Sequence, residues 1–205
     1  MKKGFCRMIA VLSLFAAAGC THLDGYLDIA KEKGMSAEYR AVLAQWTRSQ
    51  IVYSQFETRV RISATFRGPE FREAQLKEYA RLYHLSEGEK KKRAEIQEAA
   101  AADLAEFLFY AYLPEKAHND FDRRGSIWSV FLVGKNGERI EPVEVRRIDP
   151  VTPLVTEFFP YVNPHYGVAY HLRFPALAAR DAGGAPLKLV AASVIGMVEL
   201  EFGGR

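Results

Sequence analysis

The chain has 205 residues, of which 28 are Lys or Arg and 25 are Asp or Glu. Its first 19 residues hold three of the basic residues and no acidic residue, so residues 20–205 carry 25 basic and 25 acidic residues and are formally neutral. A neutral chain lacks the electrostatic footprint of a nucleic-acid-binding protein, and no nucleic-acid partner is expected. Because 49% of the residues are hydrophobic, the remaining 186 residues (205 minus 19) can fill a sizeable core.

The N-terminus has the pattern of a secretion signal. Basic residues precede an apolar run over residues 8–18, and the small residues Ala17, Ala18 and Gly19 lead directly into Cys20. The apolar run is shorter than the roughly twenty residues that a spanning helix needs. This ending resembles the lipobox of bacterial lipoproteins, although Ala17 stands where that family usually has leucine. The resemblance implies cleavage before Cys20, a diacylglyceryl thioether on its sulfur and an acyl group on its amino group.

This resemblance divides the chain into a signal peptide at 1–19, a lipidated N-terminal segment at 20–35 and a globular domain at 36–205. It implies contact with a membrane through the lipid on Cys20, and several acyl chains anchor stably where one does not. The sorting rule that accompanies the lipobox retains proteins with aspartate after the cysteine on the inner membrane. Thr21 follows here, so we expect the outer membrane, facing the periplasm. Cys6 leaves with the signal, and the exported chain has no disulfide.

The first elements after Cys20 are predicted from hydrophobic spacing. Apolar residues at helical spacing over residues 23–30 predict a short N-terminal helical segment. Ser36 is a suitable N-cap for a helix with Tyr39, Leu43 and Trp46 on one face. From residue 52 to residue 66 the period changes to two, which predicts a half-buried strand with a bend, or two strands in series.

Two helices are predicted between residues 69 and 113. Gly68-Pro69 favours a helix start, and Ser86 with Glu89 forms a capping-box pattern for a second helix that ends at Pro114. That second helix is charged over 89–98 and apolar over 104–113. We therefore expect a helical hairpin at 69–113 that docks by its base, near Phe107, Leu108 and Ala111, and projects its tip into solvent.

The basic residues 90–93 lie on the second of these helices. Acidic residues at 87, 89, 95 and 98 surround them, so a solvated helix face is favoured over a binding patch.

Strands separated by turns are predicted after residue 125. They comprise an apolar strand at 127–133 with Trp128, a turn at 135–137, a returning strand at 139–148 in which Pro142 indicates an edge or a bulge, an alternating strand at 166–174, and strands at 187–191 and 194–202. The expected fold is α+β: an immunoglobulin-like antiparallel β-sandwich with the helical hairpin as an insertion or cap. A separate N-terminal helical domain is the alternative.

Candidate catalytic and metal-binding residues are few. His118, Asp120 and Asp122 form the densest polar group, but they follow the predicted helix end, where Asn and Asp ordinarily serve turns. His165 lies in a turn and His171 on the exposed side of a strand, without partners at zinc-site spacing. No serine-hydrolase elbow, phosphate loop or zinc-protease motif occurs. No catalytic, cofactor or metal residue is assigned, and the only assigned site is lipidation at Cys20.

Aromatic residues gather in a long connection between Pro150 and Pro164. Phe158, Phe159 and Tyr161 lie in it and Tyr166 directly follows it, and exposed loops carry function more often than regular elements do. The leading interpretation is a non-catalytic envelope lipoprotein, an accessory or assembly subunit that binds a protein partner through this loop or the hairpin tip. The alternative is a periplasmic ligand-binding or hydrolytic domain that acts on cell-wall sugar or peptide, with the aromatic loop as its groove.

Overall fold

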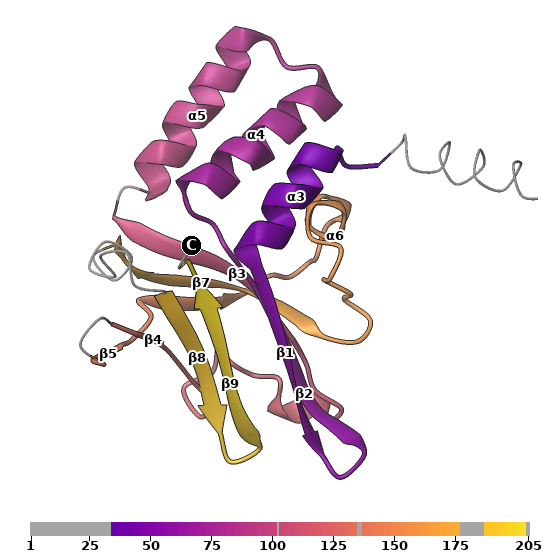
Figure 1. Ribbon diagram of the computed structural model, residues 1–205, viewed down its shortest axis with the longest axis vertical. Coiled ribbons are helices and arrows are strands. Elements are labelled where there is room, and N and C mark those ends of the chain that lie inside the picture. Colours follow the sequence, from indigo (N-terminus) through magenta and orange to yellow (C-terminus); the bar gives the residue numbers. More distant parts are fainter. Residues whose placement is uncertain (1–33, 102, 135–136, 177–186, 204–205) are drawn as a thin grey trace, which may run out of the picture. The chain divides into compact units, whose positions relative to one another are not determined.

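Two antiparallel β-sheets form the framework of the domain (Figure 1). The computed structural model describes residues 34–101, 103–134, 137–176 and 187–203. Ser36–Arg205 form one compact unit, and the fold described below is that of this unit. The predicted signal peptide, Cys20 and the helical spacing at 23–30 lie outside the described residues, as do turn residues 135 and 136.

The strands pair in the orders β1-β2-β3-β7-β6 and β5-β4-β8-β9. The five-stranded sheet consists of β1 (Thr47–Ser54), β2 (Glu57–Phe66), β3 (Leu104–Tyr112), β7 (Val168–Pro175) and β6 (Glu144–Arg147). The four-stranded sheet consists of β5 (Arg139–Ile140), β4 (Ser129–Val133), β8 (Leu187–Ser193) and β9 (Gly196–Phe202). All pairings in both sheets are antiparallel.

The main core lies between the two sheets. Buried side chains from both sheets meet there, including Ile62 and Phe107 of the five-stranded sheet and Leu132 and Leu200 of the four-stranded sheet. Trp128 is buried in the same core, where its ring stacks on Phe121 at a centroid distance of 4.9 Å. The domain is therefore a mixed α+β fold built as a β-sandwich.

Helices cover the other face of the five-stranded sheet (Figure 1). They are α3 (Ala37–Trp46), α4 (Pro69–Tyr83) and α6 (Pro153–Phe158), while α5 (Glu87–Ala101) lies beside α4. Buried aromatic rings join the covering helices: Tyr39 of α3 lies 6.1 Å from Phe71 of α4 and 5.3 Å from Phe158 of α6. A second, smaller apolar layer thus stands on the sheet opposite the main core.

Local signals predicted several helix boundaries correctly. The Ser36 hydroxyl accepts a hydrogen bond from the backbone N–H of Tyr39 and caps α3. Helix α4 begins at Pro69, and the Glu89 carboxylate accepts from the backbone N–H of Ser86 at 2.9 Å. Each of these signals acts within four residues, so tertiary packing does not override it.

The prediction that one helix runs from residue 87 to Pro114 is wrong. Helix α5 ends at Ala101, and residues 104–112 form β3 at the centre of the five-stranded sheet, between β2 and β7. This strand is buried on both faces, because one side meets the main core and the other lies under the helices. Its apolar residues therefore do not alternate, and a buried strand and a buried helix give the same pattern.

The stretch at 52–66, predicted as one bent strand or two strands in series, belongs to two strands, β1 and β2, which form an antiparallel hairpin. Strands β1 and β2 turn back at Gln55 and Phe56, with Ser54 opposite Glu57. Val60, Ile62 and Ala64 face the core as the alternation predicts. Phe56, which shares that periodicity, lies in the turn and is fully exposed.

The returning strand predicted at 139–148 is two strands in different sheets. Ile140 of β5 pairs with Leu132 of β4, whereas Val145 of β6 pairs with Leu172 of β7. Pro142 lies between them, and its missing N–H ends the ladder where the chain crosses from one sheet to the other. Pro142 was correctly predicted to disturb strand pairing, but the disturbance is a change from one sheet to the other.

Candidate functional site

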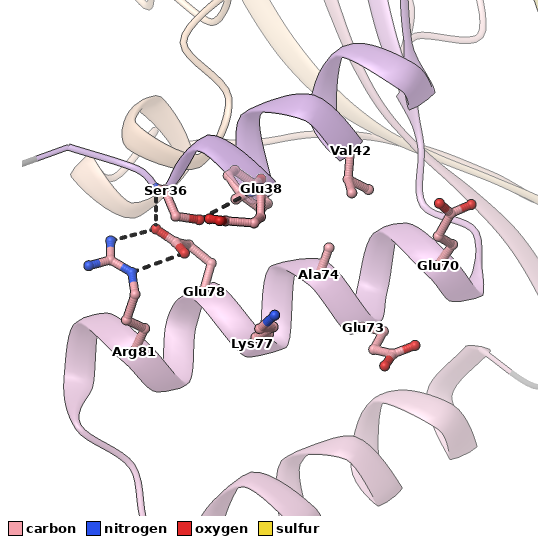
Figure 2. Close-up of a pocket in the computed structure, with 10 residues that line it drawn as sticks. Ser36, Glu38, Val42, Glu70, Glu73, Ala74, Lys77, Glu78 and Arg81 are labelled. Carbon is pink, nitrogen blue, oxygen red and sulfur yellow. Dashed lines mark hydrogen bonds and ion pairs between the residues drawn. The ribbon is translucent and has the colours of Figure 1, made fainter. Parts of the chain in front are cut away.

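A groove of about 350 Å³ lies between α3 and α4. Figure 2 shows Val42 of α3 and Ala74 of α4 pointing toward each other across it. Tyr39 completes the apolar floor. The remaining lining residues are polar or charged: Ser36, Glu38, Glu70, Glu73, Lys77, Glu78 and Arg81.

The sequence of α4 explains why this face meets α3. Positions 70, 74, 78 and 81 recur at intervals of three or four residues and so share one face of the helix. Ala74 in the middle of that face is small, which leaves space opposite Val42. The larger side chains at positions 70 and 78 then bound the groove at either end.

Glu78 fixes the start of α3 against α4. Its side chain is only 3% exposed. The carboxylate accepts from the backbone N–H of Ser36 at 2.8 Å and from Arg81 Nη2 and Nε at 2.6 and 3.1 Å (Figure 2). Burial would raise the pKa of Glu78, but the hydrogen bonds from Arg81 and Ser36 outweigh it and lower that pKa to about 2. A carboxylate at a helix N-terminus also faces the positive end of the helix dipole.

Tyr39 anchors the floor of the groove. Its hydroxyl donates to the backbone carbonyl of Phe158 at 2.9 Å, which ties α3 to α6. Burial raises the pKa of this phenol, so it stays protonated and acts as a donor.

The rim of the groove carries an excess of negative charge. Of its charged residues, Glu78 and Arg81 neutralise each other, which leaves Glu38, Glu70 and Glu73 against Lys77. Glu70 also accepts from Trp46 Nε1 at 3.1 Å. An apolar floor under an acidic rim suits a ligand that carries both a cation and an apolar group.

No protein-family model, curated protein or solved structure matches this chain. The chemistry of the groove must therefore be judged from its own residues. Its lining contains no His or Cys, and the Ser36 hydroxyl is engaged in capping. Glu78 is held ionised by Arg81, whereas a general acid or base needs a pKa near the working pH. The arrangement supports binding.

The polar stretch around His118 is hydrogen-bonded to β3 and β7 of the five-stranded sheet through Asn119. Asn119 is buried, its side-chain N–H donates to the carbonyl of Ala111 at 2.8 Å, and it accepts from the Tyr170 hydroxyl. Asp120 accepts from Ser126, whereas His118 is exposed. Within the described ranges, no group of three or more His, Cys, Asp or Glu side chains could hold a metal ion. The turn interpretation of this stretch agrees with these contacts.

The other two candidate histidines lie apart from each other. His165 is exposed in a turn whose Asn163 side chain accepts from the His165 backbone N–H. His171 is half-buried on the helix-covered side of β7, so its predicted surface position is wrong. Burial first, and then the charges of Arg67 and Arg146, lower the pKa of His171 to about 4. It is neutral near pH 7.

The aromatic connection is part of the interior, which contradicts the expected exposed groove. Phe158 and Phe159 are buried, and the Tyr161 hydroxyl lies 2.7 Å from the Thr65 hydroxyl under the helices. Tyr166 alone of the four aromatic residues is largely exposed. The loop is apolar because it helps to cover the sheet.

Residues 90–93 lie on α5, and three of the four are exposed. Lys90 is partly buried and pairs with Glu87 at 3.9 Å, and the Arg93 guanidinium lies 4.3 Å from the centre of the Tyr79 ring on α4.

No helix in the described ranges is long and apolar enough to span a bilayer.

Sequence reasoning missed Glu78, the residue around which the groove is organised. Glu78 and Arg81 are three apart on a helix, a spacing typical of exposed surface pairs. The contact that buries Glu78 is with Ser36, 42 residues away. Only the packing of α3 on α4 creates it, and no local signal encodes it.

Proposed function

We propose that this protein is a lipid-anchored envelope protein of the outer membrane, and that its periplasmic domain is a non-catalytic binding or assembly subunit. The observation that carries the proposal is the run of small residues that ends at Cys20 behind a basic and apolar leader. The neutral charge of residues 20–205 supports a protein partner over nucleic acid.

We further propose that the sandwich is immunoglobulin-like, with α4 and α5 as a helical hairpin inserted into it. Support comes from the purely antiparallel pairing, from Trp128 in the core and from the Arg93–Tyr79 contact between the two helices.

The binding surface in this proposal is the α3–α4 groove. Its three rim carboxylates against one lysine favour a partner segment with Lys or Arg, and its apolar floor favours an adjacent aliphatic side chain. The aromatic loop is a weaker candidate, because its rings are occupied in the interior.

Cys20→Ser tests the anchor. Wild-type protein is expected to incorporate palmitate, to partition into the detergent phase and to sediment with outer-membrane markers in a density gradient. The variant is expected to lose labelling and detergent partitioning, because serine cannot form the thioether. Unchanged labelling would refute the lipid anchor, and sedimentation with inner-membrane markers would refute the outer-membrane location.

Glu73→Lys tests the groove. The exposed Glu73 lines the rim, so charge reversal is expected to abolish crosslinks to a partner captured by wild-type protein in native membranes. Glu95→Lys, the same change on the exposed α5, is the matched control and is expected to keep them. If both variants lost the crosslinks equally, or if neither variant lost them, the groove would not be the binding surface.

A periplasmic domain that binds a cell-wall peptide or sugar is the second candidate. The volume of the groove, about 350 Å³, favours it, because small-molecule sites begin near this size. A basic peptide side chain would suit the rim better than a neutral sugar.

A further inference from the structure

Two neighbouring hairpins carry large, exposed apolar side chains at their tips. In the β1–β2 hairpin, Phe56 of the turn is 102% exposed and Tyr53 near the end of β1 is 61% exposed. In the β8–β9 hairpin, Val194 of the turn is 94% exposed and Met197 near the start of β9 is 55% exposed. These four residues are here named the turn-tip patch. Single exposed apolar residues are common, but a cluster of them indicates an interaction surface.

The two turns form one surface. A Cβ atom placed on Gly196 would lie 2.9 Å from Val52 Cγ1, so the β8–β9 turn rests against β1. Between the same two strands, β1 and β9, the backbone N–H of Glu199 donates to the Gln50 side chain at 2.9 Å. Figure 1 shows both turns at the end of the sheets away from α3, α4 and α5.

Charged residues are scarce in the segments that lead to these turns. Residues 49–56 and 189–198 lack Asp, Glu, Lys and Arg, in a chain that is 26% charged. In the β8–β9 turn, the Ser193 hydroxyl accepts from the backbone N–H of Ile195 at 3.0 Å, which satisfies that donor without water. The nearest charges are the exposed Glu57, which directly follows Phe56, and the exposed Glu199, so a shallow contact can bury the apolar side chains while these carboxylates stay hydrated.

The geometry of the β1–β2 turn also favours exposure of Phe56. Gln55 adopts a φ of 56°, a left-handed conformation that glycine or asparagine adopts at lower cost. The sequence keeps glutamine there and places phenylalanine next to it at the tip. Neither choice stabilises the folded domain in water, and the exposed phenylalanine is available for contact.

We propose that the turn-tip patch inserts into the boundary between the headgroups and acyl chains of a lipid bilayer. Two projecting apolar tips suit a fluid apolar phase, whereas a protein partner would need a matching concave surface. Tyr53 has the apolar ring and polar hydroxyl that favour this boundary. The proposal rests on the proposed function, because the lipid on Cys20 would hold the domain near a bilayer.

The length of the chain allows this contact. Cys20 and Ser36 are 16 positions apart, and a chain of that length reaches up to about 55 Å when fully extended, or about 40 Å with the helical segment predicted at 23–30. The ten residues of α3 and the eight of β1 place the β1–β2 turn at most about 41 Å from Ser36. The domain can therefore touch the membrane that holds its own anchor. Contact by the turns would direct the α3–α4 groove away from the bilayer.

The test is an environment-sensitive fluorophore on a single cysteine of the lipidated full chain. Cys6 leaves with the signal and Cys20 is blocked by lipid, so Phe56→Cys supplies the only free thiol. Lys92→Cys on the exposed α5 is the matched control. In phosphatidylcholine vesicles we expect a blue-shifted emission at position 56 and several-fold stronger quenching by nitroxide-labelled lipids than at position 92. Position 56 is fully exposed, so its substitution leaves the core intact.

Two results would overturn the proposal. Emission at position 56 that matches position 92 would mean that the tip stays in water. A blue shift without lipid quenching would mean that the patch contacts protein, either a second copy of this chain or another partner. Failure of the anchor itself would appear separately, because an unlipidated Cys20 would take up a second fluorophore.

Discussion

Phe107→Ala is expected to lower the free energy of unfolding by about 3–5 kcal/mol, the cost of a large cavity in a packed core. Phe107 is 0% exposed and lies on β3 at the centre of the five-stranded sheet. Its ring contacts Phe66 and Phe174 of the same sheet and Phe202 of the opposite sheet, at centroid distances of 5.0, 5.8 and 5.3 Å. Alanine at position 107 would therefore leave a cavity where the two sheets pack against each other.

Chemical denaturation measures this loss, which is a large part of the roughly 5–15 kcal/mol that stabilises a typical domain. Lys92→Gln, on the exposed part of α5, is the control and is expected to change stability by less than about 0.5 kcal/mol. Equal costs for the two variants would contradict the placement of Phe107 between the sheets.

The fate of residues 104–112 shows what a sequence pattern can and cannot predict. Burial of Phe107 and Leu108 was predicted correctly, because hydrophobic composition alone indicates burial. The element type was not, since a strand covered on both faces lacks alternation. Its four aromatic residues favoured a strand, and the length of the preceding charged helix masked that signal.

The candidate site was less predictable than the sheets. Alternation identified the core-facing residues of β2 and β7, because burial on one face leaves a period of two. The α3–α4 groove depends on how two helices pack, and the turn-tip patch depends on a hairpin that places Phe56 outside the core that its alternation predicted. Both arise from tertiary contacts that a linear pattern does not record.

The exposure of aromatic side chains differs from the sequence-based expectation both in the aromatic connection and at Phe56. Phe158 ends α6 and Phe159 directly follows it, in a connection where exposure was expected, and both are buried because the sheet needs a cover on its helical side. Phe56 fits a strand pattern, where burial was expected, and it is exposed because the chain reverses there. In each case the position of the backbone turn decides whether an aromatic side chain is available to a partner.

Glu78→Gln is expected to destabilise the domain by about 1.5–3 kcal/mol near pH 7, the range for hydrogen bonds to charged groups. The amide keeps the shape and one acceptor oxygen, but it loses the charge that Arg81 and the N-terminus of α3 stabilise. Arg81 is 48% exposed and stays hydrated, so the loss is smaller than for a fully buried ion pair. Glu73→Gln, an exposed change on the same helix, is expected to cost less than about 0.5 kcal/mol.

The effect of Glu78→Gln should depend on pH in a defined direction. The folded pKa of Glu78 is lowered to about 2, whereas an unfolded glutamate titrates near 4.3. The ionised Glu78 carboxylate therefore makes its full contribution to the free energy of unfolding above about pH 5. That contribution is lost as the pH falls toward 2, because the unfolded state binds the proton first. The difference in unfolding free energy between wild type and Glu78→Gln is expected to narrow steadily between about pH 5 and pH 3. A difference that stays constant over that range would show that the carboxylate charge does not hold α3 against α4, and that the groove owes its shape to Tyr39 and Val42 alone.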